Sequence, residues 1–269
     1  MVKAIVTGAA GRMGGRIISL IAATDGMELV GAVEQKGHDA VGRDAGEGLG
    51  LGKTGVVIED SLAACIDRGD VVIDFTFHES SVGHLETAAG KRRAMVIGST
   101  GFTEDEMGRI RGLAVNTRCV LSPNMSVGVN VLFSILDMAA GILKDDYDVE
   151  IVEAHHHLKK DAPSGTAMKM AQIIAARLGR NLDKVGVYGR KGLIGERTKD
   201  EIGIQTLRAG DIVGEHTVMF CGAGERLEFI HRAHSRDNFA KGAIRAAQWI
   251  VGQKNGLYDM LDVLGMKGN

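Results

Sequence analysis

The first 120 or so residues of this 269-residue chain alternate short apolar runs with segments of helical periodicity. Five runs are rich in Val and Ile and are mostly followed by Gly, Ser, Thr or Asn: KAIVTG, ELVGAVE, DVVIDFT, AMVIGST and RCVLSPN. Unbroken apolar runs of this length are typical of parallel strands that are buried on both faces. The alternation therefore predicts an α/β fold, a Rossmann-type doubly wound parallel sheet, with segments such as 13–25 as crossover helices.

The pattern changes after an apolar segment at 126–143, which contains an asparagine and an aspartate and is too short and too polar for a bilayer span. We expect it to be a buried helix. Four later runs, DVEIVEAHH, EIGIQTLRAG, DIVGEHTVMFC and ERLEFIHRAH, have few helical segments between them, and Gly222 and Gly224 fall where a hairpin would turn. They predict a second α+β domain with a mostly antiparallel or mixed sheet, interrupted by a helix at 164–179.

A glycine-rich loop directly follows the first apolar run, in the sequence TGAAGRMGG at 7–15. Its glycines, Gly8, Gly11 and Gly14, let the backbone turn sharply and approach a pyrophosphate at a helix N-terminus. The second run ends in Glu34, 20 residues beyond Gly14, where a carboxylate can accept hydrogen bonds from an adenosine ribose. The loop alone could be an ordinary strand-to-helix turn, but in this context it predicts a dinucleotide site.

Glu34 and two later strand ends bear on the cofactor. Glu34 is followed by Gln35 instead of an arginine. Because a carboxylate repels the 2′-phosphate of NADPH and no cation stands beside Glu34 in sequence, we expect NADH to be preferred. The segments GSTGF at 98–102 and SPNM at 122–125 fall on the carboxyl edge of the same sheet, where ligands bind in open α/β folds, although ordinary loops would explain them as well.

The stretch EAHHHLKKDAPSGTA at 153–167 gathers three histidines, two lysines and an aspartate ahead of one of the two prolines in the chain. A metal site would need more ligands: adjacent histidines on a strand point to opposite faces, so only His155 and His157 could converge, and no cysteine or HExxH spacing completes a tetrahedral shell. A solvated turn would explain the charge, but not why the histidines end an apolar strand and the lysines precede a helix.

An acid/base and anion-binding pocket accounts for both features. A helix that begins near Ser164 presents free backbone amides and the positive end of its dipole. With Lys159, Lys160 and a histidine nearby, this position is suited to hold carboxylates, and histidine can exchange a proton near neutral pH. On the residues alone we favour a pocket for a small acidic substrate, protonated where a hydride arrives, over the other two interpretations.

The charge balance and the cysteines limit the partners. With 32 basic and 34 acidic residues the formal net charge is −2, so we expect no nucleic-acid partner and no anionic membrane surface. The three cysteines, Cys65, Cys119 and Cys221, are far apart and form no CxxC pair, which is typical of a reducing compartment. The opening MVKAIVTG lacks the apolar core of a signal peptide. We expect a cytoplasmic protein with a small-molecule ligand.

Together these motifs resemble the dihydrodipicolinate reductase family, also called 4-hydroxy-tetrahydrodipicolinate reductases. The likeness runs nearly end to end and is carried by GAAGRMG at 8–14, VIDFT at 72–76, VIGSTGF at 96–102, NMSVGVNV at 124–131, EAHHHLKKDAPSGTA, and RAGDIVGEHTVMF at 208–220. The resemblance implies reduction of a cyclic, unsaturated pyridine-type dicarboxylate in lysine and diaminopimelate biosynthesis. Hydride from NADH or NADPH would go to ring carbon C4.

The resemblance also implies residue roles. His155 matches the proton donor/acceptor of the family and Lys159 its second proton donor, and the substrate-binding positions are His156, Gly165 and Thr166. The cofactor-binding positions are Gly8, Ala9, Ala10, Gly11, Arg12, Met13, Glu34, Gly98, Ser99, Thr100, Ser122, Pro123, Asn124 and Met125. No metal is implied. The chain departs from relatives that carry arginine at the position of Gln35 or Ala-Ala-Asn-Phe at 122–125.

Chain length and motifs together predict two domains. We expect a dinucleotide-binding domain at 1–126, completed by 237–269, and a substrate-binding and oligomerisation domain at 127–236, with hinges near both junctions that close over the ligands. The family is typically a homotetramer assembled through the sheet of the second domain. Two rival functions remain: an NAD(H)-binding sensor or scaffold without turnover, and a semialdehyde dehydrogenase, which would need a nucleophilic cysteine.

Overall fold

The computed structural model describes residues 1–267. The contacts within the chain divide it into two compact units: unit 1 is Met1–Val127 with the segment from Asp237 onward, and unit 2 is Gly128–Arg236. Each unit has its own sheet and its own buried apolar clusters, so each is described by itself.

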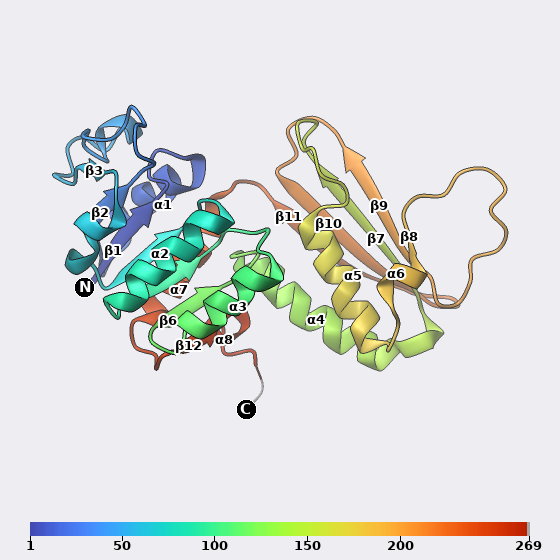
Figure 1. Cartoon of the computed structure of the whole chain (residues 1–269). Helices are drawn as coiled ribbons and strands as arrows, with labels where there is room; N and C mark the ends of the chain where they lie inside the picture. Colours follow the sequence, from blue (N-terminus) through green and yellow to red (C-terminus); the bar gives the residue numbers. More distant parts are fainter. Residues whose placement is uncertain (268–269) are drawn as a thin grey trace. The chain divides into compact units, whose positions relative to one another are not determined.

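Unit 1 is built on a seven-stranded parallel sheet with the strand order β12-β6-β5-β4-β1-β2-β3 (Figure 1). Its strands are β1 (Val2–Thr7), β2 (Met27–Val33), β3 (Ile58–Glu59), β4 (Val71–Asp74), β5 (Ala94–Ile97), β6 (Arg118–Leu121) and β12 (Gly256–Tyr258). Its helices are α1 (Arg12–Ala22), α2 (His78–Gly90), α3 (Glu104–Leu113), α7 (Asp237–Ile250) and α8 (Met260–Val263), with 3₁₀ turns at Glu47–Leu49, Leu62–Ala64 and Ile66–Arg68. The carboxyl ends of the parallel strands share one edge, where ligands bind in such sheets.

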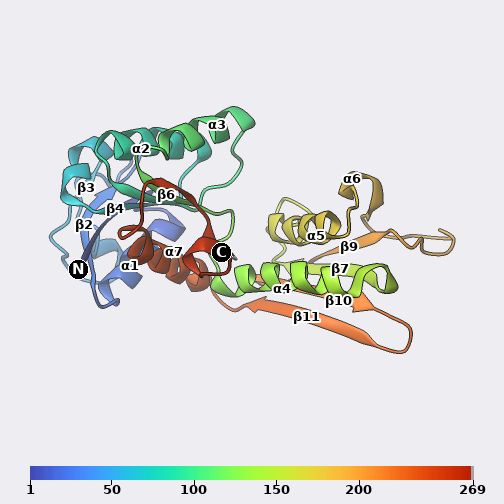
Figure 2. The ribbon, with the colours of Figure 1, turned by 90° about the horizontal axis from the view of Figure 1, so that it is seen from below.

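Successive residues of β1 face different helices. Ala4 packs in one buried cluster with Ile17 of α1 and Ala243 of α7. Ile5 packs in a second cluster with Leu85 of α2. Figure 2 shows α1 and α7 on one face of the sheet and α2 and α3 on the other. Burial on both faces explains why these strands are apolar without alternation, and the predicted doubly wound sheet is confirmed.

Unit 2 is built on a five-stranded mixed sheet with the order β11-β10-β7-β9-β8. Its strands are β7 (Asp148–His155), β8 (Gly186–Val187), β9 (Ile202–Arg208), β10 (Gly214–Cys221) and β11 (Arg226–Ala233), and its helices are α4 (Val127–Leu143), α5 (Gly165–Arg177) and α6 (Leu182–Val185), with a 3₁₀ turn at Lys144–Asp146. β10 runs antiparallel to β7 and β11, whereas β9 runs parallel to β7 and β8. The predicted mixed sheet is confirmed, and the β10–β11 hairpin turns through Gly224, whose φ is +87°.

The helix expected at 126–143 is present as α4, but the expectation that it is buried is wrong along one side. Ile135, Met138 and Ile142, spaced three and four residues apart, are exposed. The expectation that the segment is too short and too polar for a bilayer span does not hold, because Val127–Asp146 is long and apolar enough to cross a membrane. The core helix of a soluble protein passes the same test. Because the segment is apolar nearly all round, its periodicity could not show which side packs inward.

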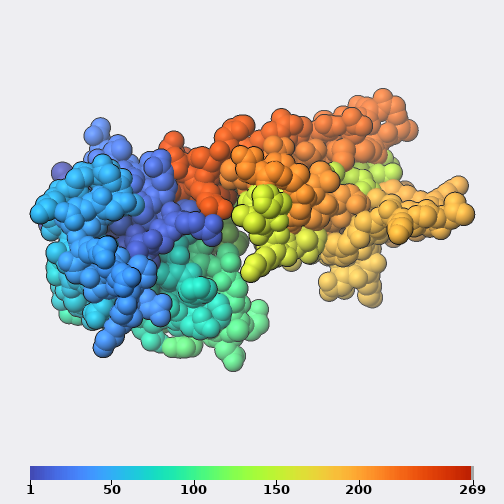
Figure 3. Space-filling model, turned by 90° about the horizontal axis from the view of Figure 1, so that it is seen from above, coloured from blue at the N-terminus to red at the C-terminus, as the bar shows by residue number. Residues whose placement is uncertain are grey.

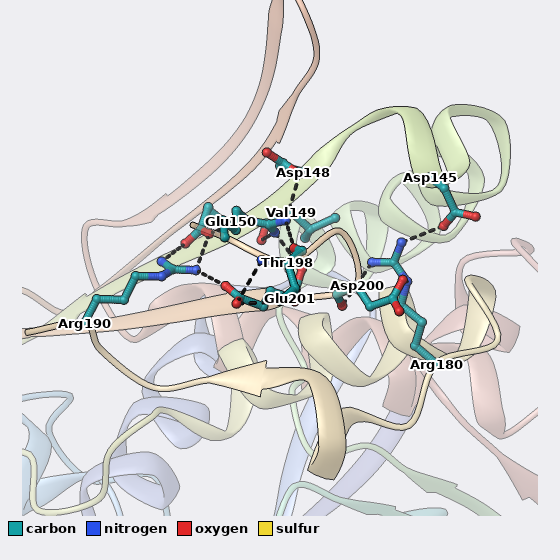
Figure 4. Close-up of polar contacts among 10 residues, drawn as sticks. Asp145, Asp148, Val149, Glu150, Arg180, Arg190, Thr198, Asp200 and Glu201 are labelled. Carbon is teal, nitrogen blue, oxygen red and sulfur yellow. Dashed lines mark hydrogen bonds and ion pairs between the residues drawn. The ribbon is translucent and has the colours of Figure 1, made fainter. Parts of the chain in front are cut away.

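The glycine-rich segment 188–201 contains neither helix nor strand and is held to β7 by two arginines (Figure 4). Arg190 donates to both carboxylate oxygens of Glu150, at 2.8 and 3.0 Å, and Arg197 donates to the same carboxylate at 3.3 Å. Glu150 fills the space over Gly203, where a Cβ would lie 1.8 Å from its Oε2. Figure 3 shows the segment projecting from unit 2 at the right of the view.

Candidate functional site

The glycine-rich loop of unit 1 joins β1 to α1 and depends on its glycines. Gly8 has a φ of +66°, in the left-handed region that side chains disfavour. A Cβ on Gly14 would lie 2.0 Å from the Gly8 carbonyl oxygen, so the first turn of α1 packs directly on the loop backbone. Gly11 is the N-cap of α1 and has no side chain to satisfy the first amides of the helix. These amides and the helix dipole suit the loop to a phosphate group.

Glu34 lies beside this loop, directly after β2. Its Oε2 accepts a hydrogen bond from the Ala10 amide and its Oε1 accepts one from the Gln35 amide, both at 2.9 Å. The carboxylate is half-buried and Gln35 is exposed. Glu34 therefore fixes the loop against the end of β2, and a ribose hydroxyl bound there would share the carboxylate with these two amides.

A cavity of about 880 Å³ lies beside the loop, with walls from the ends of β2 and β4, the segment 60–63 and α2. Among the predicted cofactor-binding residues, those that line it are Gly8, Gly11, Arg12, Met13 and Glu34. Those that are not among its lining residues are Ala9, Ala10, Gly98, Ser99, Thr100, Ser122, Pro123, Asn124 and Met125. Phe75, Thr76 and His84 line it and were not predicted. Two of them follow β4 directly, so the rule that ligands bind beyond the carboxyl ends of parallel strands could have found them.

Asp74, the last residue of β4, is a fully buried carboxylate behind this cavity. His84 bonds its Oδ2 through Nδ1 at 2.5 Å, and Thr7 of β1 donates to the same oxygen at 2.8 Å. The hydroxyl groups of Thr76, Ser81 and Ser99 donate to Oδ1 at 2.8, 2.7 and 3.1 Å. Burial alone would raise the pKa of Asp74, but the bonds from His84 and its other donors lower the pKa below its ordinary value. The aspartate ties β1, β4, α2 and the segment after β5 together.

The segments after β5 and β6 support the same sheet edge. The Ser99 hydroxyl, predicted to bind cofactor, is engaged by Asp74, and a Cβ on Gly98 would lie 2.2 Å from the Phe75 ring. The Met125 side chain is buried in the core, and its carbonyl oxygen would lie 1.8 Å from a Cβ on Gly242 of α7. Met125 could therefore contact a cofactor only through its backbone atoms.

No buried thiol supplies a nucleophile. Burial raises the pKa of Cys65 to about 11 and that of Cys119 to about 12, which keeps both protonated at neutral pH. Cys221 of β10 lies opposite Asp148 in the antiparallel register with β7, at the end of β7 that is far from His155. The semialdehyde-dehydrogenase alternative therefore lacks the cysteine that it requires.

In unit 2, β7 ends at His155, whose side chain is 12% exposed. Its Nδ1 lies 2.6 Å from Oε2 of Glu153, and its ring stands edge-on to His216 of β10 with centroids 5.3 Å apart. Burial, with the positive charge that His155 carries whenever it is protonated, lowers the pKa of His216 to about 3, so the His216 ring is neutral. His155 is thus held between a carboxylate and an uncharged ring.

The next two histidines have different environments. The His156 amide donates to Ile212 at 2.7 Å, and burial together with the charge of Arg236 lowers the pKa of its imidazole. His157 is exposed, and its Nδ1 lies 2.9 Å from the Gly210 carbonyl. Within residues 1–267 no group of three or more His, Cys, Asp or Glu residues is placed to hold a metal ion.

Lys159 is paired with Asp161 in the turn that follows. Its Nζ donates to both carboxylate oxygens at 2.8 Å, and its side chain is 21% exposed. The hydrogen bond from Lys159 lowers the pKa of Asp161. An anionic ligand of Lys159 would replace Asp161 as its partner.

Helix α5 begins where the sequence predicted. The Ser164 hydroxyl accepts from the Ala167 amide at 3.2 Å and lies 3.0 Å from Nε2 of His216, while the Ser164 amide donates to Glu153 at 2.9 Å. Gly165 and Thr166 form the first turn, where a helix has amides without intrahelical acceptors. The structure thus joins the predicted His155 and the predicted substrate-binding turn through the carboxylate of Glu153. Glu153 was not among the predicted site residues.

Comparisons with known proteins agree along the whole chain. A family described as "Dihydrodipicolinate reductase, N-terminus" matches residues 2–125, and "Dihydrodipicolinate reductase, C-terminus" matches residues 128–264. A 4-hydroxy-tetrahydrodipicolinate reductase of Syntrophus aciditrophicus (strain SB) is 67% identical over 267 residues, which cover 99% of this chain and 100% of that relative, and one of Syntrophobacter fumaroxidans (strain DSM 10017 / MPOB) is 59% identical with the same coverage. The solved structure of a dipicolinate-bound dihydrodipicolinate reductase from Paenisporosarcina sp. TG-14 superposes with a TM-score of 0.78 at 26% identity, covering 97% of this chain and 98% of that one.

Proposed function

The chain belongs to the dihydrodipicolinate reductase family, and from this premise we propose that it acts in diaminopimelate and lysine biosynthesis on 4-hydroxy-tetrahydrodipicolinate. The C4 hydroxyl leaves as water to give dihydrodipicolinate, and one hydride and one proton reduce that ring to tetrahydrodipicolinate. One observation of the structure carries the proposal: Glu153 joins the imidazole of His155 to the start of α5. This contact places an imidazole that can transfer a proton beside a helix start that is suited to bind a carboxylate. The solved relative that binds dipicolinate, a planar ring with two carboxylates, supports this class of substrate.

The roles that we propose in unit 2 follow from this geometry. His155 exchanges a proton with the ring, and Lys159 is the second proton donor. His156, whose pKa is lowered, stays neutral and can donate or accept a hydrogen bond to the substrate. Gly165 and Thr166 hold a carboxylate through the first turn of α5 and the threonine hydroxyl.

The cavity of unit 1 fits a nicotinamide dinucleotide, because Gly8 and Gly14 let the loop pack closely against the start of α1, whose first amides can bind a pyrophosphate. We propose that residues 8–13 hold the pyrophosphate and that Glu34 binds the adenosine ribose. Gly98–Thr100 and Ser122–Met125 complete the same sheet edge. When bound, NADH or NADPH supplies the hydride for ring carbon C4, and the protein supplies the proton.

Turnover tests the proposal. The protein should oxidise NADH, followed by absorbance, only when the enzymatically generated cyclic substrate is present, and pyridine-2,6-dicarboxylate should inhibit competitively with that substrate. NADH binding without oxidation under these conditions would favour a sensor or scaffold and overturn the proposed reaction.

NADH should have the lower Michaelis constant of the two cofactors. A Glu34 carboxylate that binds the adenosine ribose, as proposed, would repel a 2′-phosphate, and the exposed neighbour, Gln35, carries no charge to offset it. In a matched variant, Gln35→Arg, one added ion pair of about 1 kcal/mol should lower the Michaelis constant for NADPH by about fivefold and leave that for NADH within about twofold. A lower Michaelis constant for NADPH in the unaltered protein would contradict the assignment of Glu34.

We also propose a homotetramer, assembled through the face of the unit 2 sheet that points away from Glu153 and the apolar cluster. Leu207 of β9 and Ile230 of β11 alternate with residues of the inner face and are 54% and 46% exposed. Light scattering should give four times the chain mass of 28.5 kDa, and Ile230→Asp, which places a charge in the interface, should give smaller species. A monomer mass for the unaltered protein would rule the assembly out.

A further inference from the structure

Glu153 is the most heavily engaged carboxylate of unit 2 and has no exposed surface. Its Oε1 accepts from the Ser164 amide at 2.9 Å, from Thr206 Oγ1 at 3.1 Å and from Arg208 Nη2 at 2.9 Å. Its Oε2 accepts from Arg208 Nη1 at 3.0 Å and lies 2.6 Å from His155 Nδ1. Burial by itself would raise the pKa of Glu153, but the bonds from His155 and Arg208 lower it to about 2. The group is a carboxylate at neutral pH.

An ionised carboxylate can only accept hydrogen bonds, so the hydrogen of the neutral imidazole must lie on Nδ1 of His155. Nε2 is then the nitrogen that gains and loses a proton. Arg208 fixes the carboxylate in its plane with two parallel bonds and also donates to the Asp161 carbonyl at 2.6 Å.

On the other side of the His155 ring, Nε2 faces a glycine and no polar side chain engages it among the described residues. No hydrogen bond to Nε2 occurs among the residues that the structure describes. Gly214 of β10 lies against this nitrogen, and a Cβ there would be 3.1 Å from it. The charged and titratable groups around the ring are Glu153 of β7, Arg208 of β9, the neutral His216 of β10, and His156 and Lys159 of the turn after β7.

We propose that Glu153, fixed by Arg208, is a positioning residue for the proton-exchanging imidazole: it holds the hydrogen of His155 on Nδ1, directs Nε2 to the substrate, and with the same carboxylate fixes the start of α5. This inference rests on the proposed reductase function. It extends that function by assigning the proton transfer to one ring nitrogen and by giving Glu153 a role that neither the cofactor site nor the substrate site includes.

Glu153→Gln is the decisive variant, because it keeps the shape of the side chain and reverses the hydrogen bond to His155. It also loses the bond from Arg208 Nη1, while the bond from Arg208 Nη2 to Oε1 remains. Its Oε1 can still accept from Ser164, whereas its amide nitrogen must donate to Nδ1 and drive the hydrogen of His155 onto Nε2. A wrong tautomer of this kind should lower kcat by at least about a hundredfold. The dissociation constant of pyridine-2,6-dicarboxylate should stay within about threefold, because the α5 start is retained. Thr206→Val, which removes a donor to the same carboxylate without touching His155, should keep kcat within about threefold.

¹⁵N NMR of histidine-labelled protein reads the tautomer directly, with His155 assigned by its loss in a His155→Asn variant. The unaltered protein should show hydrogen on Nδ1, and Glu153→Gln should show it on Nε2. Hydrogen on Nε2 in the unaltered protein, or more than a third of kcat retained by a folded Glu153→Gln, would overturn the inference. The tautomer of the unaltered protein decides the question even if the variant does not fold. Absence of reductase turnover would instead refute the proposed function, since the NMR result does not depend on it.

Discussion

Replacing Lys159 with alanine should lower kcat by at least about a hundredfold, the low end for a positioned acid or base. The Nζ of this lysine is held at 2.8 Å from both oxygens of Asp161, on a side chain that is only 21% exposed. It is therefore an ordered cation in the turn between His155 and α5. Alanine removes both the proposed second proton donor and the positive charge that would attract a substrate carboxylate.

Steady-state kinetics at saturating NADH measures this effect, and the chain offers a matched control. Lys160, the next residue, is exposed, so Lys160→Ala should stay within about twofold of the unaltered protein. Asp161→Asn keeps the cation and removes its internal partner, and should keep kcat within about fivefold. A loss below threefold for Lys159→Ala would show that its proposed role is wrong.

The fold could be predicted because buried parallel strands leave a local signature, an unbroken apolar run that ends in turn residues. The two edge strands of the unit 1 sheet leave no such signature. β3 and β12 have two and three residues, too few for any periodicity, and β12 pairs with β6 through Leu257 and Cys119, which are far apart in sequence. The exposed stripe of α4 was missed for a related reason, since only tertiary packing selects the inward side of an apolar helix.

The structure brings together those residues of the candidate site that are neighbours in sequence, as in the glycine loop and the stretch around His155. The residues that act through tertiary contacts were missed, although two of them left a signal. Glu153 stands two positions before His155 and therefore on the same face of the strand, inside an apolar run where an acid must be paired. Asp74 ends another such run. Their partners, such as Arg208 of β9, come from distant segments that no local pattern connects.

Replacing Asp74 with asparagine should lower the free energy of unfolding of unit 1 by about 3–5 kcal/mol, the effect of removing one partner from a buried charged network. The amide nitrogen of asparagine would replace one carboxylate oxygen and would face donors there: Thr7 and His84 in place of Oδ2, or donors such as Ser81 in place of Oδ1. The folded-state pKa of Asp74 is lower than its ordinary value of 3.8, so the stabilisation is fully present above that value and is lost as the pH falls through the folded-state pKa. The difference between the two proteins should be largest above about pH 5 and should shrink below about pH 4.

Urea unfolding can report on unit 1 alone, because the single tryptophan of the chain, Trp249, lies in α7 and packs edge-on against Tyr258 with centroids 5.2 Å apart. Thr7→Val is the matched control: it removes one donor and leaves the carboxylate its other partners, so it should cost only about 1 kcal/mol. If Asp74→Asn and Thr7→Val unfolded at the same urea concentration, the carboxylate would contribute no more than one of its donors does. The cavity wall that Asp74 ties together would then have to be held by the apolar cluster between the sheet and α2, in which Leu85 is fully buried.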